Sequence, residues 1–267
     1  MRGETMELGV SRDVRSIFRF LTPEKKEEIA FFTHDAEAEE YIALQSDAEA
    51  EEMFDDVSHQ FISTLSGQDL ETLKHYTGFS YKEINAIMRN KWNYEENGEL
   101  TPEKKLNYQK KGYEISEILQ RCPSLNTNLK VYRGTSLRQF HEYGIFSLSD
   151  LKAMEGQYMY ESGFTSTSLV RKRSLLGMSN FFTGERNIEI EYLVPACCQD
   201  GGLLLGTLAS YYDTEYEYLI NTGSMSKVLS VEVDEKNKKA FVRALLIPKM
   251  LWDPPYMVEE TKQNKMG

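Results

Sequence analysis

The pattern of apolar residues changes near residue 125, and this change limits the fold more than any other feature of the sequence. Before it, apolar residues recur at helical spacing through acidic segments. After it, short runs rich in Val, Ile, Tyr and Thr alternate with polar residues and end at Gly, Pro or Asn. Helices followed by strands favour an α+β domain over a doubly wound sheet, in which the two would alternate along the chain.

The helical part begins with a clear start signal at Thr22-Pro23-Glu24, where a capping residue precedes a proline and an acidic first turn. Upstream lies a weak apolar cluster that fits either a docking helix or a frayed end, formed by Val14, Ile17, Phe18 and Leu21. Further helices are predicted over residues 47–63, 69–76, 81–92 and 102–120. Gly78 is expected to end one helix and Ser80 to cap the next.

In the second part, strands are predicted over residues 129–133, 163–169, 187–194, 202–205, 215–220, 226–233 and 240–248. Residues 187–194 alternate apolar and polar side chains, which is typical of a half-buried strand. Residues 253–267 contain Pro254-Pro255 and end in polar residues, so they are predicted to form a tail.

The composition excludes several classes of function. With 267 residues, 40% of them hydrophobic, the chain can bury a normal core as one large domain or two small ones. A net charge of −11 disfavours nucleic acid as a partner, although it is compatible with a local basic pocket for one small anion. The cysteines and histidines lack metal-ligand spacing, so we expect neither zinc nor a disulfide framework. Neither a signal peptide nor a membrane-spanning segment is predicted, and we expect a soluble protein.

Two glutamates, Glu215 and Glu217, stand one residue apart at the start of an apolar run. On a strand their side chains project from the same face, so two carboxylates would share one site. Like charges at such a distance are tolerated where a cationic or electron-deficient partner comes between them. The same pattern also fits a solvated strand edge.

Three short motifs occur in an order that is found in a known family of enzymes. The motifs are Val131-Tyr132-Arg133-Gly134, Gly163-Phe164-Thr165-Ser166-Thr167-Ser168-Leu169 and Glu215-Tyr216-Glu217. In this order they resemble the arginine-serine-glutamate class of mono-ADP-ribosyltransferases, which includes the enzymatic components of clostridial and bacillar binary toxins. The resemblance spans about residues 45–250 and includes the helix break from Tyr76 to Tyr81.

The resemblance implies an α+β fold in which N-terminal helices pack on a mixed or antiparallel β-core of two sheets. It also divides the chain into an N-terminal helical extension (residues 1–44), a catalytic domain (45–250) and a polar C-terminal tail (251–267).

The family's reaction breaks the bond between nicotinamide and ribose in NAD through a transition state that resembles an oxocarbenium ion, which a fixed carboxylate stabilises. The resemblance gives this role to Glu217, with Ser166 orienting its carboxylate by a hydrogen bond and with Thr167 and Ser168 supporting the strand. NAD is therefore the expected substrate, and no metal is implied. Without the resemblance, a Thr-Ser-Thr-Ser segment is an ordinary edge strand.

The same resemblance assigns NAD contacts. Arg133 and Arg186 are expected to hold the phosphates, Gly134 to let the backbone approach nicotinamide, and Phe182 to lie over nicotinamide. Taken alone, Arg133 also fits a surface residue that closes a strand.

Two tyrosines and two glycines complete the comparison with the family. Tyr76 and Tyr81 match tyrosines that cover NAD in the binary-toxin enzymes, although aromatic residues at such positions are also common in cores. Those enzymes carry an asparagine three residues before the first serine and a second basic residue after the strand-end arginine, whereas this chain has Gly163 and Gly134. These departures concern the individual NAD contacts and the target, and they leave the reaction class unchanged.

Glu215 indicates the acceptor. Family members that modify arginine carry a glutamate two residues before the catalytic one, so the resemblance implies transfer of ADP-ribose to an arginine of a target protein, among which actin is the commonest for binary-toxin enzymes. Two alternatives stay open: an NAD glycohydrolase, which delivers the ribosyl group to water, and a catalytically inactive binding module. The expected setting is a secreted or delivered effector, or a phage-encoded cytoplasmic protein.

Overall fold

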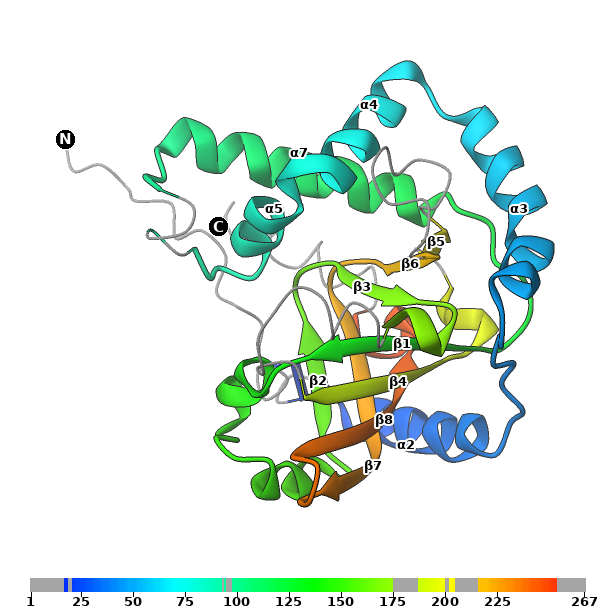
Figure 1. Cartoon of the computed structure of the whole chain (residues 1–267), viewed down its shortest axis with the longest axis vertical. Coiled ribbons are helices and arrows are strands. Elements are labelled where there is room, and N and C mark those ends of the chain that lie inside the picture. Colours follow the sequence, from blue (N-terminus) through cyan, green and yellow to red (C-terminus); the bar gives the residue numbers. More distant parts are fainter. Residues whose placement is uncertain are drawn as a thin grey trace.

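Helices from the first half of the chain pack on a mixed β-sheet built from the second half (Figure 1). The computed structural model describes residues 17–18, 21–92, 94, 98–174, 187–199, 202–204 and 216–253. Within these residues the predicted order of helices followed by strands is confirmed, and so is the α+β class.

The helices are α2 (Pro23–Glu37), α3 (Asp47–Thr64), α4 (Gly67–His75), α5 (Tyr81–Met88), α7 (Pro102–Gln120) and the short α9 (Lys249–Trp252). Thr22 caps α2 as predicted, because its hydroxyl oxygen accepts a 3.3 Å hydrogen bond from the Lys25 amide and Pro23 stands in the first turn. α7 spans the predicted range. No helix among the described residues has the length and apolar character that crossing a membrane requires.

The predicted break between α4 and α5 is wrong. A single turn of π-helix, η1 (Tyr76–Ser80), connects the two helices without interruption. Ser80 does not cap α5, since its hydroxyl donates back to the carbonyl oxygen of His75 at 2.8 Å. A π-turn widens the helix by one residue and turns the following side chains, and such turns are frequent at functional sites.

The strands are β1 (Leu129–Thr135), β2 (Tyr158–Glu161), β3 (Thr165–Ser168), β4 (Ile188–Val194), β5 (Gly202–Leu204), β6 (Glu217–Ile220), β7 (Ser224–Asp234) and β8 (Lys239–Ile247). They follow one another in space in the order β2-β7-β8-β4-β1-β3-β6-β5. β4 and β8 are parallel and the other neighbours are antiparallel, so the sheet is mixed, as expected. The sequence did not predict β2, whose four residues are too few for a clear alternation.

The expectation of two sheets is wrong, because β3 continues the ladder of β1 and makes one eight-stranded sheet. Among the described residues the two strands are in register at one pair, Tyr132 and Ser168. The strands β3, β6 and β5 are therefore joined to the rest of the sheet through this short pairing of β3 with β1. This connection brings the arginine, serine and glutamate motifs onto neighbouring strands.

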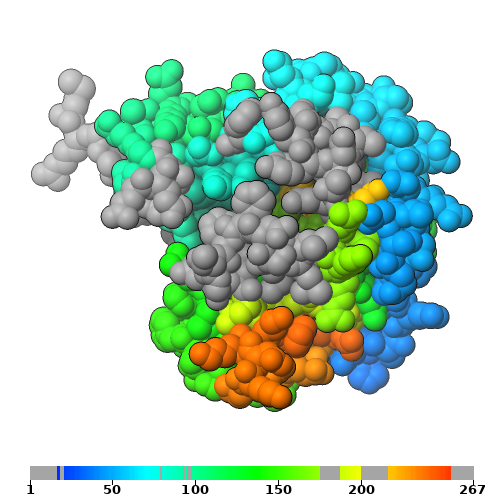
Figure 2. Space-filling view, in the orientation of Figure 1, coloured from blue at the N-terminus to red at the C-terminus, as the bar shows by residue number. Residues whose placement is uncertain are grey.

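Helices cover one face of the sheet in two places, and α3 packs on the opposite face through Phe54 and Tyr218 (Figure 1). α4, α5 and α7 pack on β6 and on Phe164, which directly precedes β3, and α2 packs on β7 and β8 through a cluster that contains Ile29 and Leu245. Figure 2 shows the same division on the surface, with the blue to green first part of the chain above and to the right of the orange C-terminal elements.

The largest apolar cluster lies on the other face of the sheet, against the 3₁₀ turns η2 (Leu137–Tyr143) and η3 (Ser149–Met154). It includes Tyr218 and Ile220 of β6, whereas Leu219 belongs to the helical cluster. Because side chains alternate along a strand, Glu217 lies on the same face as Leu219. The predicted catalytic glutamate thus faces the helices.

Candidate active site

The strands that carry Arg133, Ser166 and Glu217 are adjacent in the sheet, in the order β1, β3, β6. β3 and β6 pair so that Ser168 lies opposite Glu217 and Ser166 lies opposite Leu219. Ser166 and Glu217 are therefore diagonal neighbours on one face, a relationship in which Cα atoms are about 7–8 Å apart. The Ser166 residue is exposed.

The hydroxyl of Ser168, which lies directly opposite Glu217, is hydrogen-bonded to the main chain of Val170. It donates to the carbonyl oxygen of Val170 at 2.9 Å and accepts from the Val170 amide at 3.2 Å. This local turn ties Ser168 to the end of its own strand. Of the two serines on this face, Ser166 is the exposed one, and it is the serine that the family resemblance assigns to orienting Glu217.

Arg133 contacts β3 through its side chain. Its Nη1 donates a 2.9 Å hydrogen bond to the carbonyl oxygen of Ser166. The inner edge of β3 pairs with β6, and the amide of Leu169 continues that pairing by donating to Tyr216. The main-chain groups of residues 164 and 166 therefore point to the opposite edge of β3, the outer edge. At residue 166 the side chain of Arg133 supplies the hydrogen bond that the main chain of a paired strand would otherwise give.

Asn85 of α5 and Arg89, which directly follows α5, complete the outer edge of β3. The Phe164 amide donates to Oδ1 of Asn85 at 2.7 Å, and Nη2 of Arg89 donates to the Phe164 carbonyl at 2.7 Å. Nε of Arg89 also pairs with Glu161 at 2.7 Å. Buried polar groups require such partners, and these three contacts hold α5 at a defined position over β3.

Gly163 leaves the room for this network. A Cβ atom at position 163 would lie 2.8 Å from both Nε of Arg89 and Oδ1 of Asn85. The glycine that departs from the binary-toxin pattern is therefore required by the polar side chains of α5. Sequence reasoning gave Asn85 and Arg89 no role. The feature that could have identified them is their spacing, since two polar residues one helical turn apart lie on the same side of an amphipathic helix.

Tyr76 is hydrogen-bonded to this network. It is 3% exposed, its hydroxyl accepts from Nδ2 of Asn85 at 3.0 Å, and its ring meets Phe164 edge-on at 5.2 Å. Burial raises the pKa of Tyr76 above its ordinary value, and the nearby Glu217 carboxylate raises it further. The guanidinium group of Arg133 opposes that rise in pKa. The charges of Glu217 and Arg133 therefore both act on the Tyr76 hydroxyl.

Tyr81 is in a different environment from Tyr76. It is 44% exposed at the start of α5, where the ammonium of Lys82 lies 5.9 Å from its ring centre. The π-turn separates the two tyrosines, so one is a buried part of the scaffold and the other is open to solvent.

Several charged groups gather beneath the same site. Burial raises the pKa of Tyr192 to about 12, with Arg133 and Arg89 opposing the rise and Glu161 adding to it. Glu161 on β2 pairs with Arg89, and both Arg133 and Arg89 act on the Tyr192 hydroxyl of β4. The site combines two guanidinium groups with the carboxylate of Glu217, which suits a ligand that carries phosphates at one end and develops positive charge at the other.

Three predicted site residues, Glu215, Arg186 and Phe182, lie outside the described residues. Tyr216, between the two glutamates, has a φ of 43°, in the left-handed region, and β6 begins at Glu217. β6 therefore does not include Tyr216, and the strict alternation of side chains in this strand is described only from Glu217 onward.

Metal ligands are not grouped in the described part of the chain, where no three His, Cys, Asp or Glu side chains meet. Cys122, Cys197 and Cys198 form no disulfide bond.

Comparison with known proteins gives one family. The family described as ADP-ribosyltransferase exoenzyme matches residues 51–249, which include Arg133, Ser166 and Glu217. Comparison of the sequence with curated proteins gives no significant match.

Solved structures of low sequence identity share the fold. C3stau2 from S. aureus, solved with NAD, is 19% identical with a TM-score of 0.60, and the match covers 79% of this chain and 100% of that one. Plx2a, an ADP-ribosyltransferase toxin from Paenibacillus larvae, is 21% identical with a TM-score of 0.61, covering 78% of this chain and 100% of that one. The enzymatic component C2-I of the C2 toxin from Clostridium botulinum is 21% identical with a TM-score of 0.56, covering 76% of this chain and 47% of that one.

Proposed function

Because the chain belongs to the ADP-ribosyltransferase exoenzyme family, we propose that it moves ADP-ribose from NAD to an arginine side chain of a target protein and releases nicotinamide. The observation that carries the proposal is the convergence of three motifs. Arg133 of β1 is hydrogen-bonded to Ser166 of β3, and β3 is paired with the strand that begins at Glu217.

Glu217 has the central role in this proposal. Its carboxylate supplies a fixed negative charge beside the bond between nicotinamide and ribose, where positive charge develops as the bond breaks. Its place on the helix-facing side of β6, close to the buried Tyr76, keeps the carboxylate in a partly dry environment. Charge stabilisation is stronger there than in bulk water. Ser166 orients Glu217 from the diagonal position on β3.

In this proposal, arginine side chains bind the phosphates of NAD. Arg133 and Arg186 hold them, and a guanidinium group suits this task because it is always charged and presents a planar fork of donors. Gly134 follows Arg133 on β1 and has no side chain to block a ligand at the backbone. Phe182 covers nicotinamide. Tyr81, exposed at the start of α5, is better placed than the buried Tyr76 for direct contact with NAD.

Arginine is proposed as the acceptor because of Glu215. A carboxylate next to the catalytic one can position a guanidinium group and relieve it of a proton as it attacks. The proposed catalytic domain spans residues 45–250, and the proposed setting is a delivered effector that acts on a host protein, of which actin is one candidate.

The experiment uses the full chain, NAD carrying a tag on its adenine, and a eukaryotic lysate. Labelled proteins with ADP-ribose on arginine, located by mass spectrometry, support the proposal, and nicotinamide release is measured in parallel. Release of nicotinamide without any labelled protein would favour an NAD glycohydrolase. Absence of both would favour an inactive binding module.

A further inference from the structure

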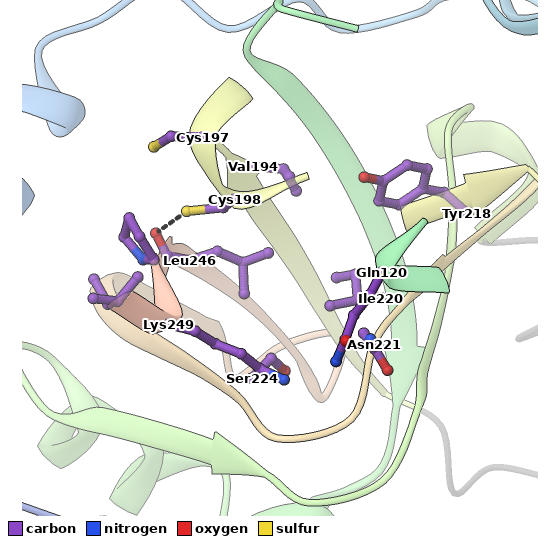
Figure 3. Close-up of a pocket in the computed structure, with 12 residues that line it drawn as sticks. Gln120, Val194, Cys197, Cys198, Tyr218, Ile220, Asn221, Ser224, Leu246 and Lys249 are labelled. Carbon is purple, nitrogen blue, oxygen red and sulfur yellow. Dashed lines mark hydrogen bonds between the residues drawn. The ribbon is translucent and has the colours of Figure 1, made fainter. Parts of the chain in front are cut away.

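A cavity lies beside β6 (Figure 3). Tyr218 and Ile220 line it, and these two residues alternate with Glu217 and Leu219 along the strand. The cavity has a volume of about 450 Å³, within the roughly 300–1,000 Å³ typical of small-molecule sites. None of the candidate active-site residues among the described part of the chain lines it.

The walls of the cavity are mainly apolar. They come from the ends of β4, β6 and β8, which supply Val194, Ile220 and Leu246. Cys198 stands beside Leu246, to whose carbonyl oxygen its thiol donates at 3.5 Å. An apolar body of a ligand would bury hydrocarbon surface against these walls.

A small set of polar groups meets at one side. Lys249 donates from Nζ to the carbonyl oxygen of Thr222 at 2.8 Å, which uses one of the three N–H donors of an ammonium group. The side chains of Gln120 and Ser224 also line the cavity and make no hydrogen bond within the described residues. The amide of Asn221 is already engaged, since it donates to Ser116 and accepts from the Thr222 amide.

The ammonium end of Lys249 is more enclosed than the residue as a whole. Lys249 counts among the exposed residues, yet its Nζ lies 3.6 Å from the point where a Cβ on Gly223 would stand. Burial lowers the pKa of Lys249 from its ordinary value, and the carboxylate of Asp253 opposes this effect in part. An anion at this position would restore the solvation that the ammonium has lost.

We propose that this cavity binds a small monocarboxylate with an apolar body, whose carboxylate pairs with Lys249 and accepts hydrogen bonds from Ser224 and Gln120. A single negative charge fits because Lys249 is the one cation among the described lining residues. A phosphate would bring a second charge and has no guanidinium group here to receive it. This site is separate from the proposed transfer reaction and does not depend on it.

The first experiment measures binding of octanoate to the full chain by calorimetry, with octanamide as a neutral ligand of the same shape. Octanoate is expected to bind about tenfold or more tightly than octanamide, because a charge-assisted hydrogen bond is lost in the amide. Lys249→Met should lower the affinity for octanoate to that for octanamide. Lys236→Met, which changes the net charge equally in an exposed turn, should leave the affinity for octanoate unchanged. Equal affinity of the two ligands for the parent, no binding at about 1 mM, or an unchanged Lys249→Met variant would each overturn the proposal.

A second measurement locates the ligand. In a Cys197→Ser variant, octanoate should slow alkylation of Cys198 by N-ethylmaleimide several-fold, and octanamide at the same concentration should not. Alkylation at an unchanged rate would contradict the assignment of the ligand to this cavity. Because this measurement keeps Lys249, it decides the question even if Lys249→Met does not fold.

Discussion

Arg133 on β1 donates a hydrogen bond of 2.9 Å from Nη1 to the main-chain carbonyl of Ser166 on β3. The residue expected to hold the phosphates of NAD is therefore also part of the scaffold that places the expected partner of Glu217. A substitution at Arg133 acts on ligand binding and on strand geometry together, and an experiment must separate the two effects.

Arg133→Ala should raise the NAD concentration needed for activity by tens of fold or more, since a charge-assisted phosphate contact contributes roughly 1.5–3 kcal/mol. It should also lower the melting temperature, because the Ser166 carbonyl loses its donor. Calorimetry with NAD and thermal unfolding report the two effects separately. Arg243→Ala is the matched control, since Arg243 lies on β8, separated from β1 by β4, and pairs with Glu191. Unchanged NAD affinity in Arg133→Ala would remove Arg133 from the site.

Glu217→Gln should abolish both protein labelling and NAD hydrolysis while the fold stays intact. Loss of one preorganised group commonly costs about 10²–10³ in rate, and here the charge itself is removed. Nicotinamide release at saturating NAD is the measurement, with Glu232→Gln, an exposed glutamate of β7, as the control. A variant that cleaves NAD at near the parent rate would show that another group is the catalytic carboxylate.

Glu215→Gln should abolish labelling of arginine and keep substantial NAD hydrolysis. Glu217 serves the step common to both outcomes, whereas Glu215 serves the acceptor, and water needs no positioning carboxylate to trap the ribosyl group. Nicotinamide release and target labelling are measured side by side. A proportional fall in both would mean that Glu215 supports the active-site loop and does not select arginine.

Gly163→Ala should destabilise the protein by about 1–3 kcal/mol, because the added Cβ would lie 2.8 Å from Arg89 and Asn85 and force apart the network on the outer edge of β3. The measurement is the midpoint of denaturant unfolding. Gly67→Ala, in the first turn of α4 with no atom within 4 Å of the new Cβ, should be neutral or slightly stabilising. If both variants unfold at the same midpoint, the network does not need the glycine.

Glu189→Gln should change the dependence of stability on pH. Burial raises the pKa of Glu189 above its ordinary value in spite of the ion pair with Arg171, and its Oε2 is buried without a hydrogen bond. A carboxyl group with a raised pKa in the folded state contributes stability that is present below its unfolded pKa of about 4.3 and lost as pH rises through the raised value. The melting temperature of the variant minus that of the parent should therefore increase between about pH 4 and pH 7. The increase should be about 2–4 °C for each kcal/mol of unfolding free energy that the parent loses over this range. The opposite trend would show that attraction to Arg171 outweighs burial.

Much of the fold was predictable because its signals are local. The cap at Thr22, the full length of α7 and the strands β4, β7 and β8 depend on caps, turn residues and periodicity within a few positions of one another. The predicted break from Tyr76 to Ser80 was wrong because Gly78 and Ser80 favour the end and the start of a helix, whereas packing of both flanking helices against Phe164 and Leu219 overrode that local preference.

The sequence by itself determined which residues carry the chemistry, since arginine, serine and glutamate stand in motifs that can be read along the chain. Only the tertiary structure decided how they meet: that Ser168 and not Ser166 lies opposite Glu217, that Tyr76 is buried while Tyr81 is exposed, and that one sheet forms. These outcomes depend on strand register and on contacts such as Arg133 with Ser166, 33 residues apart, and Asn85 with Phe164, 79 residues apart. The free energy of such contacts comes from groups that are neighbours only after the chain has folded, so no local pattern encodes them.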